Sequence, residues 1–87
     1  MNENINQKNL KHISKHLPDF QVHEPSITLD DVLQLGQQIA SRPENLIGNP
    51  GDRQIFEQYV NLGGQQIRVR VVLNSLGRLR SVHIRDR

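Results

Sequence analysis

Apolar side chains recur at helical spacing in the first part of the chain and at alternate positions in the last third. The first helical stripe, with intervals of three and four residues, consists of Leu10, Ile13, Leu17 and Phe20. This spacing predicts an amphipathic helix that starts near Lys8. Pro18 has no N–H and disfavours helical backbone in the residue before it. We therefore expect Pro18 to stop this helix and His16 to lie in its last turn.

A capping motif predicts a second helix. The Thr28 hydroxyl can accept a hydrogen bond from the first turn while the Asp31 carboxylate reaches back. The apolar positions that follow are again spaced as in a helix: Leu29, Val32, Leu33, Ile39 and Ala40. Gly36 lies on the same stripe and leaves room for a close approach. The helix is expected to end near Arg42. Residues 43–53 contain two prolines and two glycines and are expected to form a loop.

The period changes to two after Arg53. This alternation predicts three strands, over residues 55–62, 66–73 and 78–85. Gly63-Gly64 joins the first pair of strands, and residues 74–77 join the second. Helices followed by an antiparallel meander indicate an α+β fold. We expect two N-terminal helices packed on one face of a small antiparallel β-sheet, with the other face open.

The length of 87 residues limits the chain to one domain. We assign residues 8–87 to it and expect residues 1–7, which are polar and without period, to be a frayed start. The sequence has no cysteine, which excludes disulfides and thiolate metal sites. No stretch approaches the roughly 18 apolar residues of a membrane span, and no signal-peptide pattern is present. We therefore expect no membrane anchoring by this domain.

The net charge of +2 is unevenly distributed. Residues 1–16 hold three lysines and one glutamate (+2), whereas residues 17–64 hold two arginines and seven acidic residues (−5). Residues 65–87 hold six arginines and one aspartate (+5). The two basic ends suit a polyanion such as nucleic acid or a membrane surface. A solvated charged surface would give the same counts.

Side chains of a strand alternate between its two faces. Because the odd positions of the second predicted strand are apolar, Arg68 and Arg70 turn to the other face. The apolar even positions of the last strand turn Ser81, His83 and Arg85 the same way. Cations, a hydroxyl and an imidazole together can move the protons of RNA cleavage and stabilise the charged phosphorane. A sheet face that is merely solvated would show the same alternation.

His12 and His16 are four residues apart, the spacing at which two histidines of a helix can share a zinc ion. A zinc hydrolase helix would carry Glu where Ile13 stands, and the flanking Lys11 and Lys15 repel a cation. We therefore expect no metal and no cofactor. The two interpretations that remain are phosphate or acid–base chemistry and a solvated basic helix face.

Aromatic rings that could stack on bases are scarce. Phe20 and Phe56 are needed by the core, and only Tyr59 has the parity that takes it to the open face. A sheet that binds single strands by stacking would present two or three exposed rings.

Two segments resemble one family of nucleases. Residues 15–20 (KHLPDF) resemble the Lys-His-x-x-Asp-Phe segment of the colicin D nuclease domain. Residues 77–84 (GRLRSVHI) resemble the Gly-x-x-x-Ser-x-Trp-x hairpin strand of the same domain. The arrangement also resembles the C-terminal toxin domains of contact-dependent growth inhibition effectors. Their barnase-like fold, shared in general form by RelE, places helices before an antiparallel sheet.

The resemblance implies a metal-independent ribonuclease toxin that cuts tRNA near its anticodon or acceptor end. It implies a bacteriocin-like protein that acts in the cytoplasm of a target bacterium. The toxin would be delivered as the C-terminal part of a larger secreted or surface effector and neutralised by an acidic cognate immunity protein.

Carried over by position, the resemblance also implies roles for single residues. His16 takes the place of the catalytic histidine, Lys15 of an adjacent active-site lysine and Ser81 of a serine that contacts the phosphate. His83 stands where the family has Trp, and Ile13 where it has a further lysine.

We therefore predict an endoribonuclease that uses the substrate's own 2′-OH and leaves a 2′,3′-cyclic phosphate. The expected catalytic residues are His16, Lys15, Ser81, His83 and Arg70. The expected RNA-binding residues are Arg68, Lys11, His12, Tyr59 and Arg85. Two alternatives stay open: a ribosome-dependent mRNase toxin of the RelE kind, and a non-catalytic RNA- or DNA-binding module or antitoxin.

Overall fold

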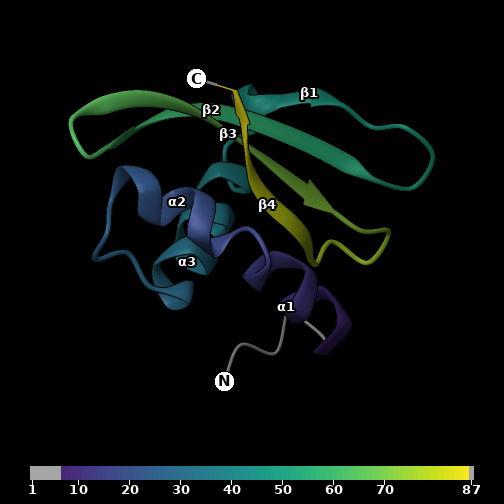
Figure 1. The fold of residues 1–87 in the computed structure, drawn as a ribbon. Helices are drawn as coiled ribbons and strands as arrows, with labels where there is room; N and C mark the ends of the chain where they lie inside the picture. The colour runs from purple at the N-terminus through teal and green to yellow at the C-terminus, as the bar shows by residue number, and fades with distance from the viewer. Residues whose placement is uncertain (1–6, 87) are drawn as a thin grey trace.

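A computed structural model describes residues 7–86 as a group of helices followed by a four-stranded antiparallel sheet (Figure 1). The helices are α1 (Gln7–Ser14), α2 (Leu17–His23), α3 (Leu29–Ala40) and the 3₁₀ turn η1 (Pro43–Asn45). The strands, adjacent in the sheet in chain order, are β1 (Leu46–Gly48), β2 (Gln54–Leu62), β3 (Gln65–Leu73) and β4 (Leu79–Asp86). The predicted α+β class is confirmed. The start assigned to residues 1–7 lies outside the described residues except for Gln7, the first residue of α1.

The first predicted helix is in fact two helices, because the chain turns at Lys15 and His16. Pro18 lies in the first turn of α2, where its missing N–H costs no hydrogen bond. His16 is the residue that caps the start of α2, and its carbonyl accepts from the Asp19 N–H at 3.1 Å. The expectation that Pro18 ends a helix with His16 in its last turn is therefore wrong. Pro18 starts a helix, and His16 lies at the joint.

The helix α3 begins at the predicted cap. Thr28 Oγ1 accepts from the Asp31 N–H at 3.2 Å, and the Asp31 carboxylate accepts from the Thr28 N–H at 3.0 Å. The helix packs against β2, β3 and β4. A Cβ atom on Gly36 would lie 2.6 Å from Val82 Cγ2, so the absence of a side chain lets α3 approach β4 this closely.

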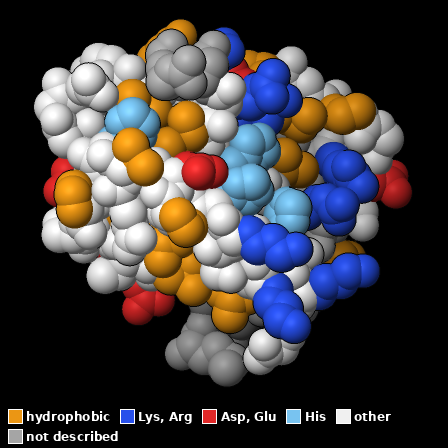
Figure 2. All heavy atoms as spheres, in the orientation of Figure 1, with side chains coloured by type: hydrophobic (Ala, Val, Ile, Leu, Met, Phe, Trp, Pro, Cys, Tyr) orange, Lys and Arg blue, Asp and Glu red, His pale blue; other side chains and the backbone are white. Residues whose placement is uncertain are grey.

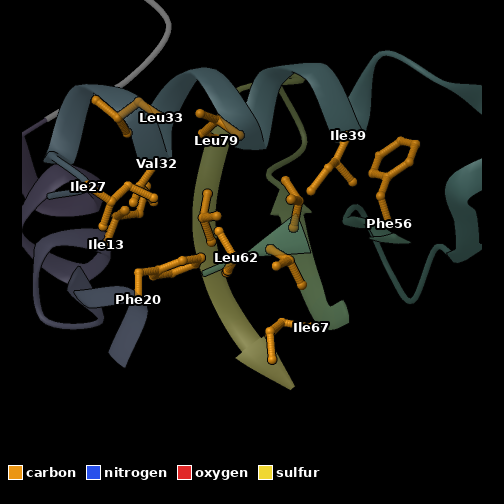
Figure 3. Packing of buried hydrophobic residues seen from close by; sticks show 13 residues of the cluster. Ile13, Phe20, Ile27, Val32, Leu33, Ile39, Phe56, Leu62, Ile67 and Leu79 are labelled. Carbon is orange, nitrogen blue, oxygen red and sulfur yellow. The ribbon is translucent and has the colours of Figure 1, made fainter. Parts of the chain in front are cut away.

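One apolar core fills the layer between the helices and the sheet. It contains 13 side chains, each with 9% or less of its surface exposed. In Figure 3, Ile13 and Phe20 from the first two helices point toward the same layer as Val32 and Ile39 of α3. The core therefore lies on one face of the sheet, and no helix of residues 7–86 covers the other face (Figure 1).

The strand pair β2–β3 keeps one register from end to end, whereas β4 is irregular. Its pairing with β3 shifts twice, and Arg80 and Arg85 are the extra residues that have no partner on β3. Bulges of this kind change the direction of a side chain, and both arginines are exposed. Next to the first bulge, the Leu79 carbonyl accepts from Asn9 Nδ2 at 3.1 Å, which ties α1 to β4.

The segment expected to be a loop, residues 43–53, contains η1 and the short edge strand β1, which pairs with β2. Within the described part of the chain, no helix has the length and apolar composition needed to cross a membrane.

Candidate functional site

The uncovered sheet face carries a row of polar residues across three strands. Glu57 of β2 lies opposite Arg70 of β3, and Arg70 lies opposite His83 of β4. Directly paired residues of an antiparallel sheet point to the same face. Arg68 and Ser81 lie on this face too, one row to either side. The register thus brings Arg68, Arg70, Ser81 and His83 to one face, as the alternation of the sequence predicted.

Three histidines from different elements form an array beside this row. The ring centroids of His12 and His16 are 5.4 Å apart with the planes at 79°, and those of His16 and His83 are 5.4 Å apart at 35°. His12 comes from α1, His16 from the joint before α2, and His83 from β4. Figure 2 shows histidine side chains gathered near the centre of one face, bordered by Lys and Arg side chains.

The hydroxyl of Ser81 fixes the ring of His83. Ser81 Oγ and His83 Nδ1 are 2.7 Å apart and share a hydrogen bond. Ser81 is only 5% exposed, so it lies beneath the imidazole. With Nδ1 engaged, Nε2 is the ring nitrogen of His83 left to meet a ligand.

The environment of His83 disfavours its protonated form. Partial burial, followed by the positive charges of His16, Arg70, Arg85 and His12, lowers the pKa of His83 from 6.5 to about 4. His83 is therefore neutral at neutral pH and able to take up a proton. An anion placed among these cations would relieve the repulsion and raise this pKa.

The same effects act on His12. Burial, followed by the charges of His16, Arg80 and Lys15, lowers the pKa of His12. Arg80 and Lys15 therefore lie close enough to His12 to contribute to the charge of the array.

His16 faces an acidic partner. Its Nδ1 lies 3.6 Å from Asp19 Oδ2, across the first turn of α2. Asp19 stands inside the KHLPDF segment, and its spacing of three residues from His16 is the sequence signal for the pair.

Glu57 is a further residue of the site that the sequence interpretation missed. Its Oε2 accepts from Arg70 Nε at 2.7 Å, and its Oε1 lies 3.7 Å from Arg68 Nη1. The Glu57 side chain is 11% exposed, so this carboxylate holds both guanidinium groups against the sheet. The signal was available, because Glu57 shares the parity of Tyr59 on the predicted strand.

Not every predicted site residue joins the array. Tyr59 is 61% exposed and lies opposite Arg68 on β2, two strands and about 10 Å from β4. Lys11 is exposed on α1. Arg80, in contrast, was not among the predicted site residues, although its charge helps to lower the pKa of His12. It has the parity of the apolar Val82, and a charged residue at a core position is itself the signal of a bulge.

The array provides acid–base groups and cations in one place. A neutral imidazole, a second imidazole next to it and guanidinium groups on the same face can bind an anion and move protons to and from it. Among residues 7–86, no three His, Asp or Glu side chains are arranged to hold a metal ion. No protein-family model, curated protein or solved structure matches this chain.

Proposed function

We propose that the chain is an endoribonuclease toxin that cuts tRNA without a metal ion. The observation that carries the proposal is the His12–His16–His83 array beside Arg70, with the His83 ring held by Ser81. RNA supplies its own nucleophile, so cleavage needs a base, an acid and cations around the phosphate.

In this mechanism neutral His83 takes the proton of the 2′-OH, and O2′ attacks the adjacent phosphorus. The bond between phosphorus and O5′ breaks as protonated His16 donates a proton to the leaving oxygen. The products are a 2′,3′-cyclic phosphate and a 5′-hydroxyl. A general base works best with a pKa near the working pH. The bound phosphodiester therefore has a second role, since its negative charge raises the pKa of His83 from its low value in the free protein.

The cations act on the phosphorane. Arg70 lies directly across from His83, and Lys15 lies next to His16 in the chain. A guanidinium held by a carboxylate through Nε, as Arg70 is by Glu57, still presents its two terminal nitrogens to a phosphate. Ser81 acts through His83, in place of the direct phosphate contact that the resemblance implied. The concentration of positive charge also disfavours a divalent cation at this position.

The motifs at residues 15–20 and 77–84 support the toxin assignment. The same resemblance implies an acidic immunity protein as partner. The cationic face around the histidines is complementary in charge to such an acidic surface.

The decisive experiment incubates the purified protein with bulk tRNA, with and without a chelator, and maps the RNA ends. Cyclic phosphate ends from tRNA alone, unaffected by the chelator, support the proposal. Cleavage that needs ribosomes identifies an mRNase of the RelE kind instead. Binding with a steep salt dependence and no products at any pH identifies a non-catalytic RNA-binding module.

A further inference from the structure

A polar pocket lies outside the histidine array. It has a volume of about 480 Å³ and lies between the β1–β2 loop at residues 50–53 and the β3–β4 turn at Asn74 and Ser75, with Arg80 in its wall. This volume falls in the range of about 300–1000 Å³ that small-molecule sites occupy. A smaller cavity of about 170 Å³, between the end of α3 and the same turn, has no ionisable side chain in its wall.

Two arginines from distant parts of the chain meet at the larger pocket. Arg53 comes from the β1–β2 loop, and Arg80 is the extra residue of the first bulge on β4. Asp52 is the acidic residue of the wall, so two positive charges oppose one negative charge. A pair of guanidinium groups with a net positive charge is suited to a phosphate.

The β3–β4 turn forms a rigid side of this pocket. Asn74 Oδ1 accepts from the backbone N–H groups of Leu76 at 2.9 Å and Arg78 at 3.0 Å. The Asn74 N–H donates to the Arg78 carbonyl at 2.8 Å. Because this wall is already fixed, its polar groups lose little conformational freedom when a ligand binds.

Arg80 relates the pocket to the array. This residue lines the pocket and also lies near enough to His12 for its charge to act on that imidazole. The positive charge around the array therefore extends to Arg80, and Arg80 shares the pocket wall with Arg53. No aromatic ring lines the pocket, which favours recognition of a phosphate over stacking of a base.

We propose that this pocket binds the phosphate of the nucleotide next to the one that is cut, with Arg53 and Arg80 as its ligands. This inference rests on the proposed ribonuclease activity and extends it: the substrate must present two consecutive phosphates, one at the histidines and one at the pocket.

The test compares a dinucleoside monophosphate with trinucleoside diphosphates extended by one nucleotide on either side. For the wild type, we expect kcat/KM to be about tenfold higher for one of the extended substrates, the gain typical of hydrogen bonds to a charged group. Arg80→Ala and Arg53→Ala should each reduce this preference toward unity. Arg78→Ala removes an exposed arginine from the same hairpin, outside the pocket, and should retain the full preference.

Binding of the same oligonucleotides with a 2′-deoxy group at the scissile position separates the pocket from the chemistry. The inference is supported if Arg53→Ala and Arg80→Ala both lose affinity for the extended analogue and keep their affinity for the short one. The same result in a protein that cuts no RNA still supports the pocket, and only the ribonuclease proposal then fails. A wild type that does not distinguish short from extended ligands, or a preference that survives in both variants, overturns the inference.

Discussion

Ser81 Oγ lies 2.7 Å from His83 Nδ1, with the serine buried beneath the imidazole on an edge strand. This contact joins two residues of the same strand that point to the same face. It leaves the ring one free nitrogen, and the centroid of the His16 ring lies 5.4 Å from that of His83. In the proposed mechanism the serine therefore positions the imidazole toward the substrate.

Ser81→Ala should reduce kcat about tenfold with little change in KM, because a hydrogen bond that positions the ring is lost. A purely structural role for the hydroxyl would leave the tautomer of His83 unchanged, so nitrogen NMR of the ring is the deciding measurement. We expect the two tautomers to become mixed in the variant. Ser41→Ala, which removes an exposed hydroxyl at the end of α3, should change neither kcat nor the NMR signal.

His16→Ala should lower the rate of tRNA cleavage by roughly 10²- to 10⁴-fold, the usual contribution of a general acid or base. His23→Ala provides the matched control, since His23 Nδ1 contacts Gln65 Oε1 at 3.3 Å, outside the array. The control should keep the wild-type rate. A folded His16→Ala protein that cuts tRNA at the wild-type rate would remove His16 from the mechanism.

Stability should rise with pH between about pH 4 and 6.5. The pKa of His83 is about 4 in the folded protein against 6.5 for an ordinary histidine, so in this window the unfolded chain binds a proton that the folded chain does not. The free energy of unfolding then increases by roughly 1–3 kcal/mol across the window and gains nothing further from His83 above it. The lowered pKa of His12 acts in the same direction.

Urea titrations at pH 4 and pH 7 measure this difference. His83→Asn keeps a polar atom where Nδ1 meets Ser81 but cannot titrate, and its stability should depend less on pH over the same range. An equal pH dependence in the variant and the wild type would contradict the low pKa of His83.

Glu57→Gln should weaken the fold and strengthen RNA binding at the same time. Two guanidinium groups lose their shared negative charge, and one of the two acceptor oxygens becomes an amide NH₂, which should lower the free energy of unfolding by about 1–3 kcal/mol. The net charge becomes more positive by one, so affinity for RNA should rise at low salt and fall more steeply as salt is added. Cleavage should slow, because Arg70 is no longer held beside His83.

Fluorescence anisotropy at several salt concentrations, together with urea unfolding, checks the effects on affinity and stability. Glu44→Gln changes the net charge equally at an exposed position in η1. It should raise affinity much less. Equal increases in the two variants would show that Glu57 acts through net charge alone.

Gly36→Ala should disturb the site from the opposite side of the sheet. The new Cβ would stand 2.6 Å from Val82 Cγ2, and a valine side chain has little freedom to move aside. We expect a loss of about 1–3 kcal/mol in the free energy of unfolding. The NMR signals of His83 should shift, because Val82 lies between Ser81 and His83 on β4.

Gly48→Ala serves as the control, since a Cβ added there has no atom within 4 Å beyond those of its own and the two adjacent residues. The two variants should differ clearly in melting temperature. Similar melting temperatures would show that β4 moves away from α3 at little cost.

Much of this arrangement follows from local patterns in the sequence. The alternation and the turn glycines place β2 and β3 within one residue of their observed bounds, and parity alone turns Arg70 and His83 to one face. The prediction that Pro18 ends a helix was wrong because a proline can occupy the first turn of a helix as readily as it can follow the end of one. Only the packing of the apolar residues on its two sides distinguishes these cases.

Parity marks Arg80 and Glu57 as unusual positions, but it does not by itself give the pairing of β4 or the ion pairs of Glu57. Arg80 is an extra residue only because Leu79 and Val82 both face the core, which requires knowledge of how β4 pairs with β3. The contact of Glu57 with Arg70 joins residues 13 positions apart and depends on the exact register of β2 and β3. Long-range pairing of this kind is invisible in a local period.

The bond from Asn9 to the Leu79 carbonyl spans 70 positions of the chain. Together with the meeting of His16 and His83, it means that the site consists of contacts between the two ends of the described chain, the contacts that lead to slow folding. A partly folded molecule can keep the charges of its arginines and lysines, but it cannot assemble the histidines. During refolding, attraction to polyanions should therefore return before catalysis does.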